Sequence, residues 1–258
     1  IAPADGSPLS ISTCPLGYGS AALQDPASHQ HLQLVAAAFA ALAEASGRAL
    51  VLAIEPEPDG ALERVSDLAN WLQQSFTPTQ REFLGICWDL CHSAVVGETT
   101  AVVLRSLAST GVKLAKIQIS SALELLAPMT PTGRQRFQQL TEDAYLHQVR
   151  GVAATGAPFA FADMTDFLAS ADSHSCHQVR VHCHVPVCRR DYGEGLSGTP
   201  WQAAVVAAWQ AGYRDFELET YTLLGLPDEV LERGSVVDTM KSEMLACFSA
   251  LQLDTPAV

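Results

Sequence analysis

Positive charge is scarce in this chain. Lysine and arginine number 15 against 28 aspartate and glutamate residues, which gives a formal net charge of −13 at pH 7. Because such a surface repels phosphate backbones, the composition argues against nucleic acid as a partner. Charged residues make up only 17% of the chain and hydrophobic residues 48%, so the sequence is too apolar for a disordered protein. Its 258 residues can build one sizeable core, and we expect a single domain over residues 1–258.

Long apolar runs and a dense cysteine framework are also missing. No run reaches the roughly 18 to 20 residues that a membrane helix needs, so we expect no membrane span. The cysteines are scattered over the chain, unlike those of small secreted domains, and reduced thiols in a cytoplasmic protein are the simplest interpretation. The first residue is Ile1 rather than Met, and we expect the natural N-terminus to lie before it.

Short apolar runs alternate with longer stretches of helical pattern. The predicted strands are residues 10–14, 49–55, 83–89, 112–120, 178–184 and 215–220. The predicted helices are residues 29–46, 60–75, 95–109, 132–150, 200–211 and 227–251, with Gly47, Thr132 and Thr199 as expected caps. Residues 158–162 form a further short strand or a loop, after which Asp163 is expected to cap a helix through Leu168.

This alternation predicts an α/β fold with right-handed crossovers. An open Rossmann-like sheet would need a glycine-rich phosphate loop, and Gly17 and Gly19 lack the third glycine and the acidic partner of that motif. A (β/α)8 TIM barrel instead predicts polar residues at the carboxyl ends of several strands. We expect the barrel, incomplete at its N-terminus, because only about six of its eight strands can be found in the sequence. Its unpaired edges would favour oligomers.

Polar side chains do end the predicted strands. They are Glu55, Asp89 with His92 three residues on, Gln118, the run His182-Cys183-His184, and Glu219. Burying several carboxylates at one barrel mouth would be costly without a cation. Carboxylate and imidazole ligands suit Mn²⁺, Mg²⁺, Fe²⁺, Co²⁺ or Zn²⁺, so we expect a divalent metal ion as cofactor.

The order of these motifs resembles the xylose isomerase-like superfamily, which includes sugar and sugar-phosphate isomerases, ketose 3-epimerases and the endonuclease IV type of phosphodiesterase. The resemblance rests on strand-Glu-Pro, then strand-Asp-x-x-His, then a final strand-Glu. Residues 10–18, 180–186 and 217–222 (SISTCPLGY, RVHCHVP and ELETYT) are in addition similar to the EboE family of bacterial metabolite-traffic proteins.

The resemblance implies that residues 10–14 are the third strand of the barrel and that Glu219 ends the eighth. It also implies that Glu55, Asp89 and Glu219 are metal ligands, with His92 as a further ligand or a substrate contact. In the epimerase-type barrels the two glutamates act as acid and base from opposite faces of the substrate. The resemblance therefore gives Glu55 and Glu219 catalytic roles, and it gives His92 the role of stabilising an enediolate.

One position departs from the family pattern. Gln118 stands where the family has a histidine, and its carbonyl oxygen can coordinate a hard cation but is a poorer ligand than imidazole. The expected metal ligands therefore include Gln118 and His184 besides Glu55, Asp89 and Glu219. Either His184 substitutes for that histidine or the metal site is weakened. The expected substrate contacts, besides His92, are His182, Arg180 and Lys116.

Three functions follow as hypotheses. The first is a metal-dependent isomerase or epimerase that acts on a small sugar, polyol or precursor metabolite. The second is a carrier that binds a metabolite with a degenerate metal site and without turnover, which Gln118 favours. The third, cleavage of damaged DNA, conflicts with the net charge of −13. Metal content separates the first two.

Overall fold

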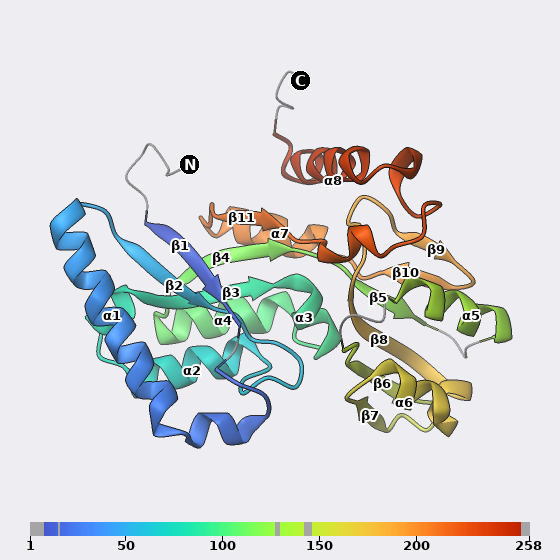
Figure 1. The fold of residues 1–258 in the computed structure, drawn as a ribbon, viewed down its shortest axis with the longest axis horizontal. Coiled ribbons are helices and arrows are strands. Elements are labelled where there is room, and N and C mark those ends of the chain that lie inside the picture. The colour runs from blue at the N-terminus through green and yellow to red at the C-terminus, as the bar shows by residue number, and fades with distance from the viewer. Residues whose placement is uncertain (1–7, 15, 127–129, 142–145, 254–258) are drawn as a thin grey trace. The chain divides into compact units, whose positions relative to one another are not determined.

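A computed structural model describes residues 8–14, 16–126, 130–141 and 146–253 of the chain (Figure 1). The chain divides into two compact units. The first comprises the described residues up to Gln118 together with Tyr213–Glu217. The second comprises the described residues of Ile119–Gly212 and those from Leu218 onward. None of the helices in these ranges is both long and apolar enough to cross a membrane.

The first unit is built on a five-stranded sheet in the order β1-β2-β3-β4-β11. The strands are β1 (Leu9–Thr13), β2 (Leu50–Ile54), β3 (Leu84–Asp89), β4 (Leu114–Ile119) and β11 (Phe216–Leu218). The neighbours from β1 to β4 run parallel. Every residue of β3 is buried, which explains why this strand reads as an apolar run without alternation. The five predicted strands of this sheet are therefore confirmed, each within a few residues of its expected bounds.

Four helices belong to this sheet, and their ends follow local sequence signals. They are α1 (Pro26–Ser46), α2 (Val65–Ser75), α3 (Leu90–Val95) and α4 (Thr100–Thr110). Asp25 caps α1 by accepting a hydrogen bond from the Ala27 N–H, and Gly47 ends it in the left-handed conformation, as predicted. α1 packs against β2, and α2 packs against both α4 and β3.

The second unit contains a six-stranded antiparallel sheet in the order β7-β6-β8-β5-β10-β9. Its strands are β5 (Ala122–Leu125), β6 (Val149–Ala153), β7 (Pro158–Phe161), β8 (Cys176–His184), β9 (Asp191–Gly193) and β10 (Leu196–Gly198). Its helices are α5 (Pro131–Leu140), α6 (Met164–Ala169), α7 (Gln202–Gln210) and α8 (Val236–Leu251). Short 3-10 helices span Ser20–Gln24 and Gln80–Glu82 in the first unit, and Ala171–His174, Tyr221–Leu224 and Glu232–Gly234 in the second.

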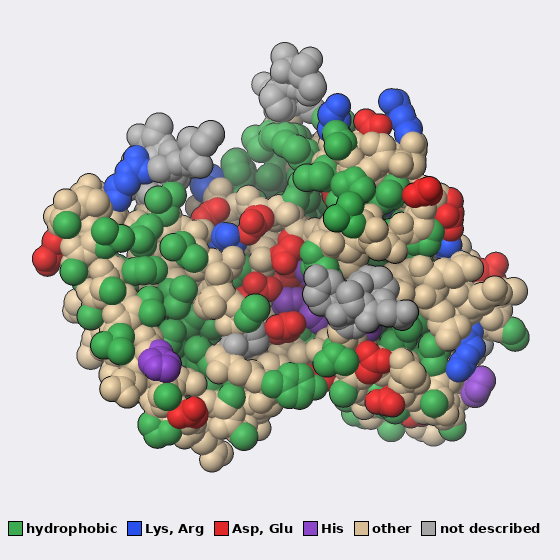
Figure 2. Space-filling model, viewed as in Figure 1, with side chains coloured by type: hydrophobic (Ala, Val, Ile, Leu, Met, Phe, Trp, Pro, Cys, Tyr) green, Lys and Arg blue, Asp and Glu red, His purple; other side chains and the backbone are tan. Residues whose placement is uncertain are grey.

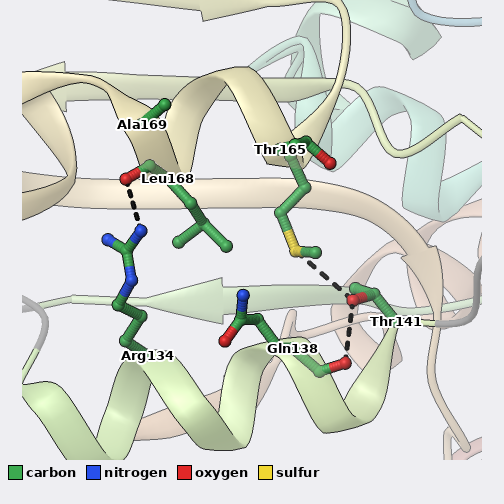
Figure 3. A pocket seen from close by; sticks show the side chains of 7 residues that line it. Arg134, Gln138, Thr141, Thr165, Leu168 and Ala169 are labelled. Atoms are coloured by element: carbon green, nitrogen blue, oxygen red, sulfur yellow. Dashed lines mark hydrogen bonds between the residues drawn. The ribbon is translucent and has the colours of Figure 1, made fainter.

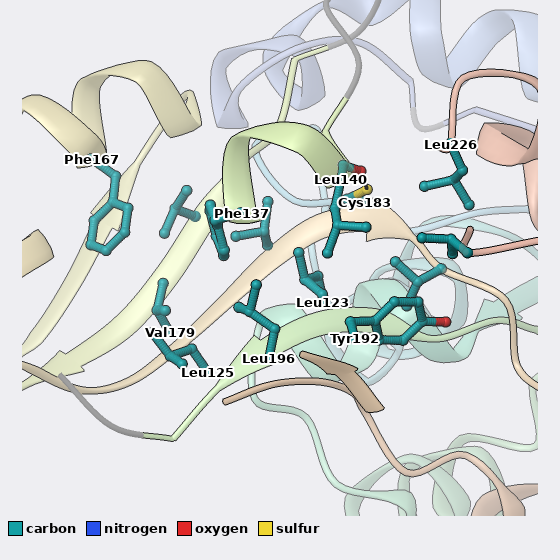
Figure 4. Packing of buried hydrophobic residues seen from close by; sticks show 14 of the residues in the cluster. Leu123, Leu125, Phe137, Leu140, Phe167, Val179, Cys183, Tyr192, Leu196 and Leu226 are labelled. Atoms are coloured by element: carbon teal, nitrogen blue, oxygen red, sulfur yellow. Dashed lines mark hydrogen bonds between the residues drawn. The ribbon is translucent and has the colours of Figure 1, made fainter. Parts of the chain in front are cut away.

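One face of the antiparallel sheet carries the core of the second unit (Figure 4). Val149 of β6, Val181 of β8 and Leu123 of β5 lie side by side in register and are fully buried. Phe137 of α5 and Phe167 of α6 pack in the same cluster, with ring centroids 6.5 Å apart. Because side chains alternate along a strand, the residues between these apolar positions point to the opposite face.

The surface reflects the composition. Figure 2 shows acidic side chains spread over the visible face, with fewer basic ones among them. Hydrophobic side chains gather over α8 in the same view. Val237, Met240, Met244 and Leu245 are between 47% and 60% exposed there, and their spacing places them along one side of the helix.

The expected TIM barrel is wrong. Residues 178–184, which we expected to form a parallel barrel strand, belong to β8 at the centre of the antiparallel sheet. Buried Val179 and Val181 alternate with half-buried Gln178 and Arg180, which is the pattern of a strand with one polar face. Sequential βα units account only for the sheet of the first unit, and the second unit follows antiparallel topology.

Several predicted helices differ from the observed ones. The helix expected at residues 132–150 ends at Leu140, and Val149 already begins β6. The helix expected at residues 95–109 begins only at Thr100 as α4, because Val95 is the last residue of α3 and Gly97 follows in the left-handed conformation. α2 starts only at Val65 and α8 only at Val236, later than predicted.

The remaining predictions concern one short strand and the residues that cap three helices. Residues 158–162 largely form a strand, β7, and Asp163 caps α6 through the Thr165 N–H as predicted. Thr130 rather than Thr132 caps α5. Thr199 does not cap α7, because its hydroxyl accepts a hydrogen bond from the Ala122 N–H.

Candidate metal centre

Two predicted ligands sit at the same edge of the parallel sheet. Glu55 directly follows β2, and its N–H donates to the carbonyl oxygen of Thr13 at 3.0 Å. Asp89 is the last residue of β3, the neighbouring parallel strand. The carboxyl ends of parallel strands lie at one edge, where open α/β sheets bind their ligands. The first unit therefore places both carboxylates where such folds place their sites.

Asp89 also begins the next helix. Its Oδ1 accepts a hydrogen bond from the backbone N–H of His92 at 2.8 Å and so caps α3. A single helical turn then returns the imidazole toward the strand end, where His92 Nε2 lies 3.9 Å from Asp89 Oδ1. The spacing Asp-x-x-His is thus explained by a helix cap that brings both side chains together.

Contacts of the second ring nitrogen, Nδ1, fix the orientation of the His92 side chain. Its Nδ1 lies 3.0 Å from the carbonyl oxygen of Pro56 and 3.3 Å from Glu55 Oε1. A carbonyl oxygen can only accept, so Nδ1 carries the proton and the lone pair of the neutral ring is on Nε2. Metal-bound histidines are held by hydrogen bonds of this kind on the second nitrogen.

Glu55, Asp89 and His92 together can hold a metal ion. Each offers one ligand atom, and these three atoms all lie within 4.8 Å of one another. Asp89 is 1% and His92 5% exposed, and the Glu55 side chain is 12% exposed. Two carboxylates and one imidazole suit borderline and hard divalent ions. The first unit therefore contains a mostly buried cluster with the composition and spacing of a metal site.

Glu57 is a neighbour of this cluster that the sequence analysis missed. Burial, and next the charge of Asp89, raise the pKa of the Glu57 carboxyl above its ordinary value. The available signal was the run Glu55-Pro56-Glu57-Pro58, because alternate residues of an extended segment point to the same side.

Gln118 lies beside the cluster on β4, where it is paired in register with Asp89. Its Oε1 accepts a hydrogen bond from the Cys87 thiol at 2.9 Å, and the side chain is buried. The amide oxygen, which we expected to coordinate the metal, is thus engaged by a strand neighbour. Its role as a ligand stays a prediction.

Lys116, which we expected to contact substrate, interacts with two residues of the sheet. Its ammonium group pairs with Glu217 at 2.8 Å and donates to Ser12 Oγ at 3.3 Å. Burial alone would lower the pKa of Lys116, but the hydrogen bond and charge of Glu217 outweigh it and raise the pKa. These contacts link β4 to the edge strands of the sheet, and substrate binding by Lys116 stays a prediction.

The other predicted site residues belong to the second unit. His182 and His184 lie on the same side of β8 with ring centroids 5.6 Å apart, as their spacing predicted. His184 Nδ1 donates to the backbone carbonyl of Glu219 at 2.8 Å, and His182 Nδ1 lies 2.7 Å from Gln148 Oε1. Both imidazoles are thereby fixed in orientation, while the metal and acid–base roles of His184 and Glu219 stay predictions.

A separate open pocket of about 350 Å³ lies between α5 and α6 (Figure 3). The Arg134 guanidinium donates to the Leu168 carbonyl at 2.6 Å, and the Thr141 hydroxyl contacts Met164 Sδ at 3.3 Å. These polar contacts hold the two helices together, so the polar residues that line the pocket have a structural role.

Comparison of the chain with models of known protein families, with curated proteins and with solved structures finds no match.

Proposed function

We propose that this chain binds a divalent metal ion through Glu55, Asp89 and His92 and acts as an isomerase or epimerase on a small sugar, polyol or sugar phosphate. The observation that carries the proposal is the convergence of these three ligand atoms to within 4.8 Å in a largely buried position. The motif order that resembles the xylose isomerase-like superfamily supports the reaction class. A fold with two different sheets is compatible with it, because function depends on the site rather than on the fold.

Each side chain has a distinct role in this proposal. A bound divalent ion would supply Lewis acidity toward a carbonyl and a neighbouring hydroxyl of the substrate. We assign proton transfer to the carboxylate of Glu55, which takes the proton from the carbon next to the carbonyl. In an isomerase Glu55 then delivers the proton to the adjacent carbon. In an epimerase Glu55 keeps the proton that it took, and a second acid on the opposite face delivers another proton to the same carbon.

The tautomer of His92 decides between its two expected roles. With the Nδ1 proton directed at Pro56, Nε2 is an acceptor and cannot donate a hydrogen bond to an enediolate. His92 is therefore assigned as a metal ligand rather than as the group that stabilises the intermediate.

A non-catalytic carrier is the second candidate. The observation in its favour is the hydrogen bond between Cys87 and Gln118, which engages the amide at the position where the family has a histidine. A protein of this kind would bind a polyol at a degenerate metal site, without a tightly bound ion, and would not exchange a substrate proton with solvent.

Deuterium exchange tests the proposal. The protein with Mn²⁺ or Mg²⁺ is incubated in D2O with a panel of sugars and sugar phosphates, and ¹H NMR follows the proton next to the carbonyl. We expect exchange with at least one compound, loss of exchange in Glu55→Gln, and full exchange in Glu44→Gln, a control at an exposed position of α1. No exchange across the panel in a protein that holds no tightly bound metal would support the carrier and contradict the isomerase or epimerase.

A further inference from the structure

The pocket between α5 and α6 is bracketed by two contacts between the helices (Figure 3). At one end the Arg134 guanidinium donates to the carbonyl oxygen of Leu168 at 2.6 Å. At the other end the Thr141 hydroxyl contacts Met164 Sδ at 3.3 Å. Gln138 lies between these two contacts, because residues 134, 138 and 141 share one face of the helical segment. The contacts hold the helices apart and leave a space of about 350 Å³ between them.

The size of this space suits a small molecule. Protein interiors are close-packed, and small-molecule sites start at about 300 Å³. At about 30 Å³ for each group of the size of water, the pocket has room for about ten such groups. Leu168, which is 5% exposed, gives it an apolar wall together with Met164 and Ala169 of the same helix. A ligand with many hydroxyl groups would lose hydrogen bonds against that wall, so a short hydrocarbon chain fits better.

Arg134 lines the pocket with donors that the fold does not use. Its hydrogen bonds go to the Leu168 carbonyl and, at 3.4 Å, to Ser173 Oγ. A guanidinium carries five N–H donors, so three of them have no acceptor among the described residues. Within the same ranges no carboxylate pairs with Arg134, whereas Arg136 pairs with Glu229 at 2.9 Å. Arg134 therefore brings an unneutralised positive charge and spare donors to the pocket wall.

Gln138 adds a second donor to the same side of the pocket. Figure 3 shows Arg134 and Gln138 on α5 and the side chain of Leu168 reaching from α6 across the space. The Gln138 amide makes no hydrogen bond among the residues that the structure describes. A carboxylate can accept two parallel N–H bonds from an arginine, and its remaining lone pairs can accept from an amide. The pocket thus has donors for a carboxylate on α5 and an apolar wall on α6.

We infer that this pocket binds a small aliphatic carboxylate, with the carboxylate group on Arg134 and Gln138 and the hydrocarbon chain against Leu168 and Met164. The site lies wholly within the second unit, and it does not depend on the metal centre of the first.

Calorimetric titration with hexanoate tests the site, after metal ions have been removed with a chelating resin so that none of them holds the acid. Hexanamide has the same chain without the charge, and acetate has the charge without the chain. We expect hexanoate to bind, and each of the other two to bind at least about tenfold more weakly. Equal affinity for hexanamide would contradict the carboxylate contact, and equal affinity for acetate would contradict the apolar wall. No binding of hexanoate at millimolar concentration would overturn the inference.

Substitution of the two arginines of α5 separates the site from a general effect of charge. Arg134→Gln should bind hexanoate about tenfold more weakly or worse. Arg136→Gln removes a charge from the same helix outside the pocket and should bind as the parent does. Because Arg134→Gln also loses the contact with Leu168, its fold is checked by circular dichroism.

Two variants at exposed positions keep the test decisive if Arg134→Gln does not fold. Gln138→Ala removes the amide and should bind hexanoate several-fold more weakly, whereas Gln135→Ala, an exposed control on α5 outside the pocket, should bind as the parent does. Ala169→Trp places a large side chain at the pocket and should abolish binding. Parent-like affinity in folded Arg134→Gln, or in both Gln138→Ala and Ala169→Trp, would overturn the inference.

Discussion

Asp89 Oδ1 accepts a hydrogen bond from the backbone N–H of His92 at 2.8 Å and lies 3.9 Å from Nε2 of the same residue. Asp89 is thus the last residue of a buried strand. Its carboxylate both caps the following helix and belongs to the candidate metal site. The helix cap requires only an acceptor, whereas tight binding of a divalent cation requires a charged ligand. Substitutions can separate these two roles.

Asp89→Asn is predicted to lose metal affinity while keeping stability. Asparagine retains an oxygen acceptor for the His92 N–H but has no negative charge, so we expect metal affinity to fall at least about tenfold. Asp89→Ala should lose affinity and, in addition, about 1 kcal/mol of stability through the missing cap. Metal titration and urea unfolding measure the two effects separately. Unchanged affinity in Asp89→Asn would show that this carboxylate is only a cap.

Phe167→Ala is predicted to destabilise the second unit. The side chain is fully buried and contacts the rings of Phe137, Phe159 and Phe161 at centroid distances from 5.6 to 6.5 Å. Truncation of a buried aromatic residue costs about 3–5 kcal/mol. Leu126→Ala, at a position 60% exposed, should change stability by about 0.5 kcal/mol or less. Chemical denaturation checks both, and equal effects would contradict the assigned core.

Cys188 and Cys247 are predicted to react slowly with iodoacetamide at pH 8. Burial, and then the charge of Glu243, raise the pKa of Cys188 to about 11 and that of Cys247 to about 12. Because the thiolate is the nucleophile, about one Cys188 thiol in a thousand is reactive at this pH. Peptide mass spectrometry should show that exposed Cys14 is modified first and that Glu243→Gln accelerates both slow sites. Rates equal to that of Cys14 would contradict the buried environment.

Glu243 is predicted to make stability fall as pH rises. Its Oε1 accepts hydrogen bonds from the Val187 N–H at 3.0 Å and the Thr220 hydroxyl at 2.7 Å, but burial outweighs both and raises the pKa of the carboxyl. Between the ordinary pKa and the raised one, the folded protein binds more protons than the unfolded chain, so the free energy of unfolding decreases with pH. This contribution is complete at low pH and is lost as pH rises through that interval.

Glu243→Gln keeps the acceptor and removes the titration. Urea unfolding between pH 4 and pH 8 should therefore show a smaller loss of stability in the variant than in the parent. A pH dependence identical in both proteins would contradict the assignment. Glu243→Ala leaves the buried Val187 N–H without its acceptor and should cost about 1–3 kcal/mol at every pH.

The parallel sheet was predictable because its signals are local. Strands buried on both faces read as apolar runs, and Glu55 and Asp89 stand where two such runs end. The Asp-x-x-His motif predicted a shared site for Asp89 and His92, and the helix cap brings their side chains together.

The antiparallel sheet was not predictable from the same signals. Residues 178–184 satisfy the apolar pattern of a strand, but the partners of β8 are β6 and β5, and strand pairing at such sequence separation leaves no local mark. The family resemblance then placed this strand in a barrel. The hydrogen bond that orients His92 was not predictable either, because its acceptor is the backbone carbonyl oxygen of Pro56 rather than a side chain.

The central claim is that Glu55, Asp89 and His92 bind a divalent ion, and metal stoichiometry tests it most directly. The purified protein is stripped with a chelator, loaded with Mn²⁺, Co²⁺ or Zn²⁺, dialysed and measured by mass spectrometry of its metal content, in parallel with Glu55→Gln, Asp89→Asn and the surface control Glu44→Gln. The account predicts about one ion per chain in the parent and in Glu44→Gln, and substantially less in the two site variants. Equal metal content in all four proteins, or none in the parent, would contradict it.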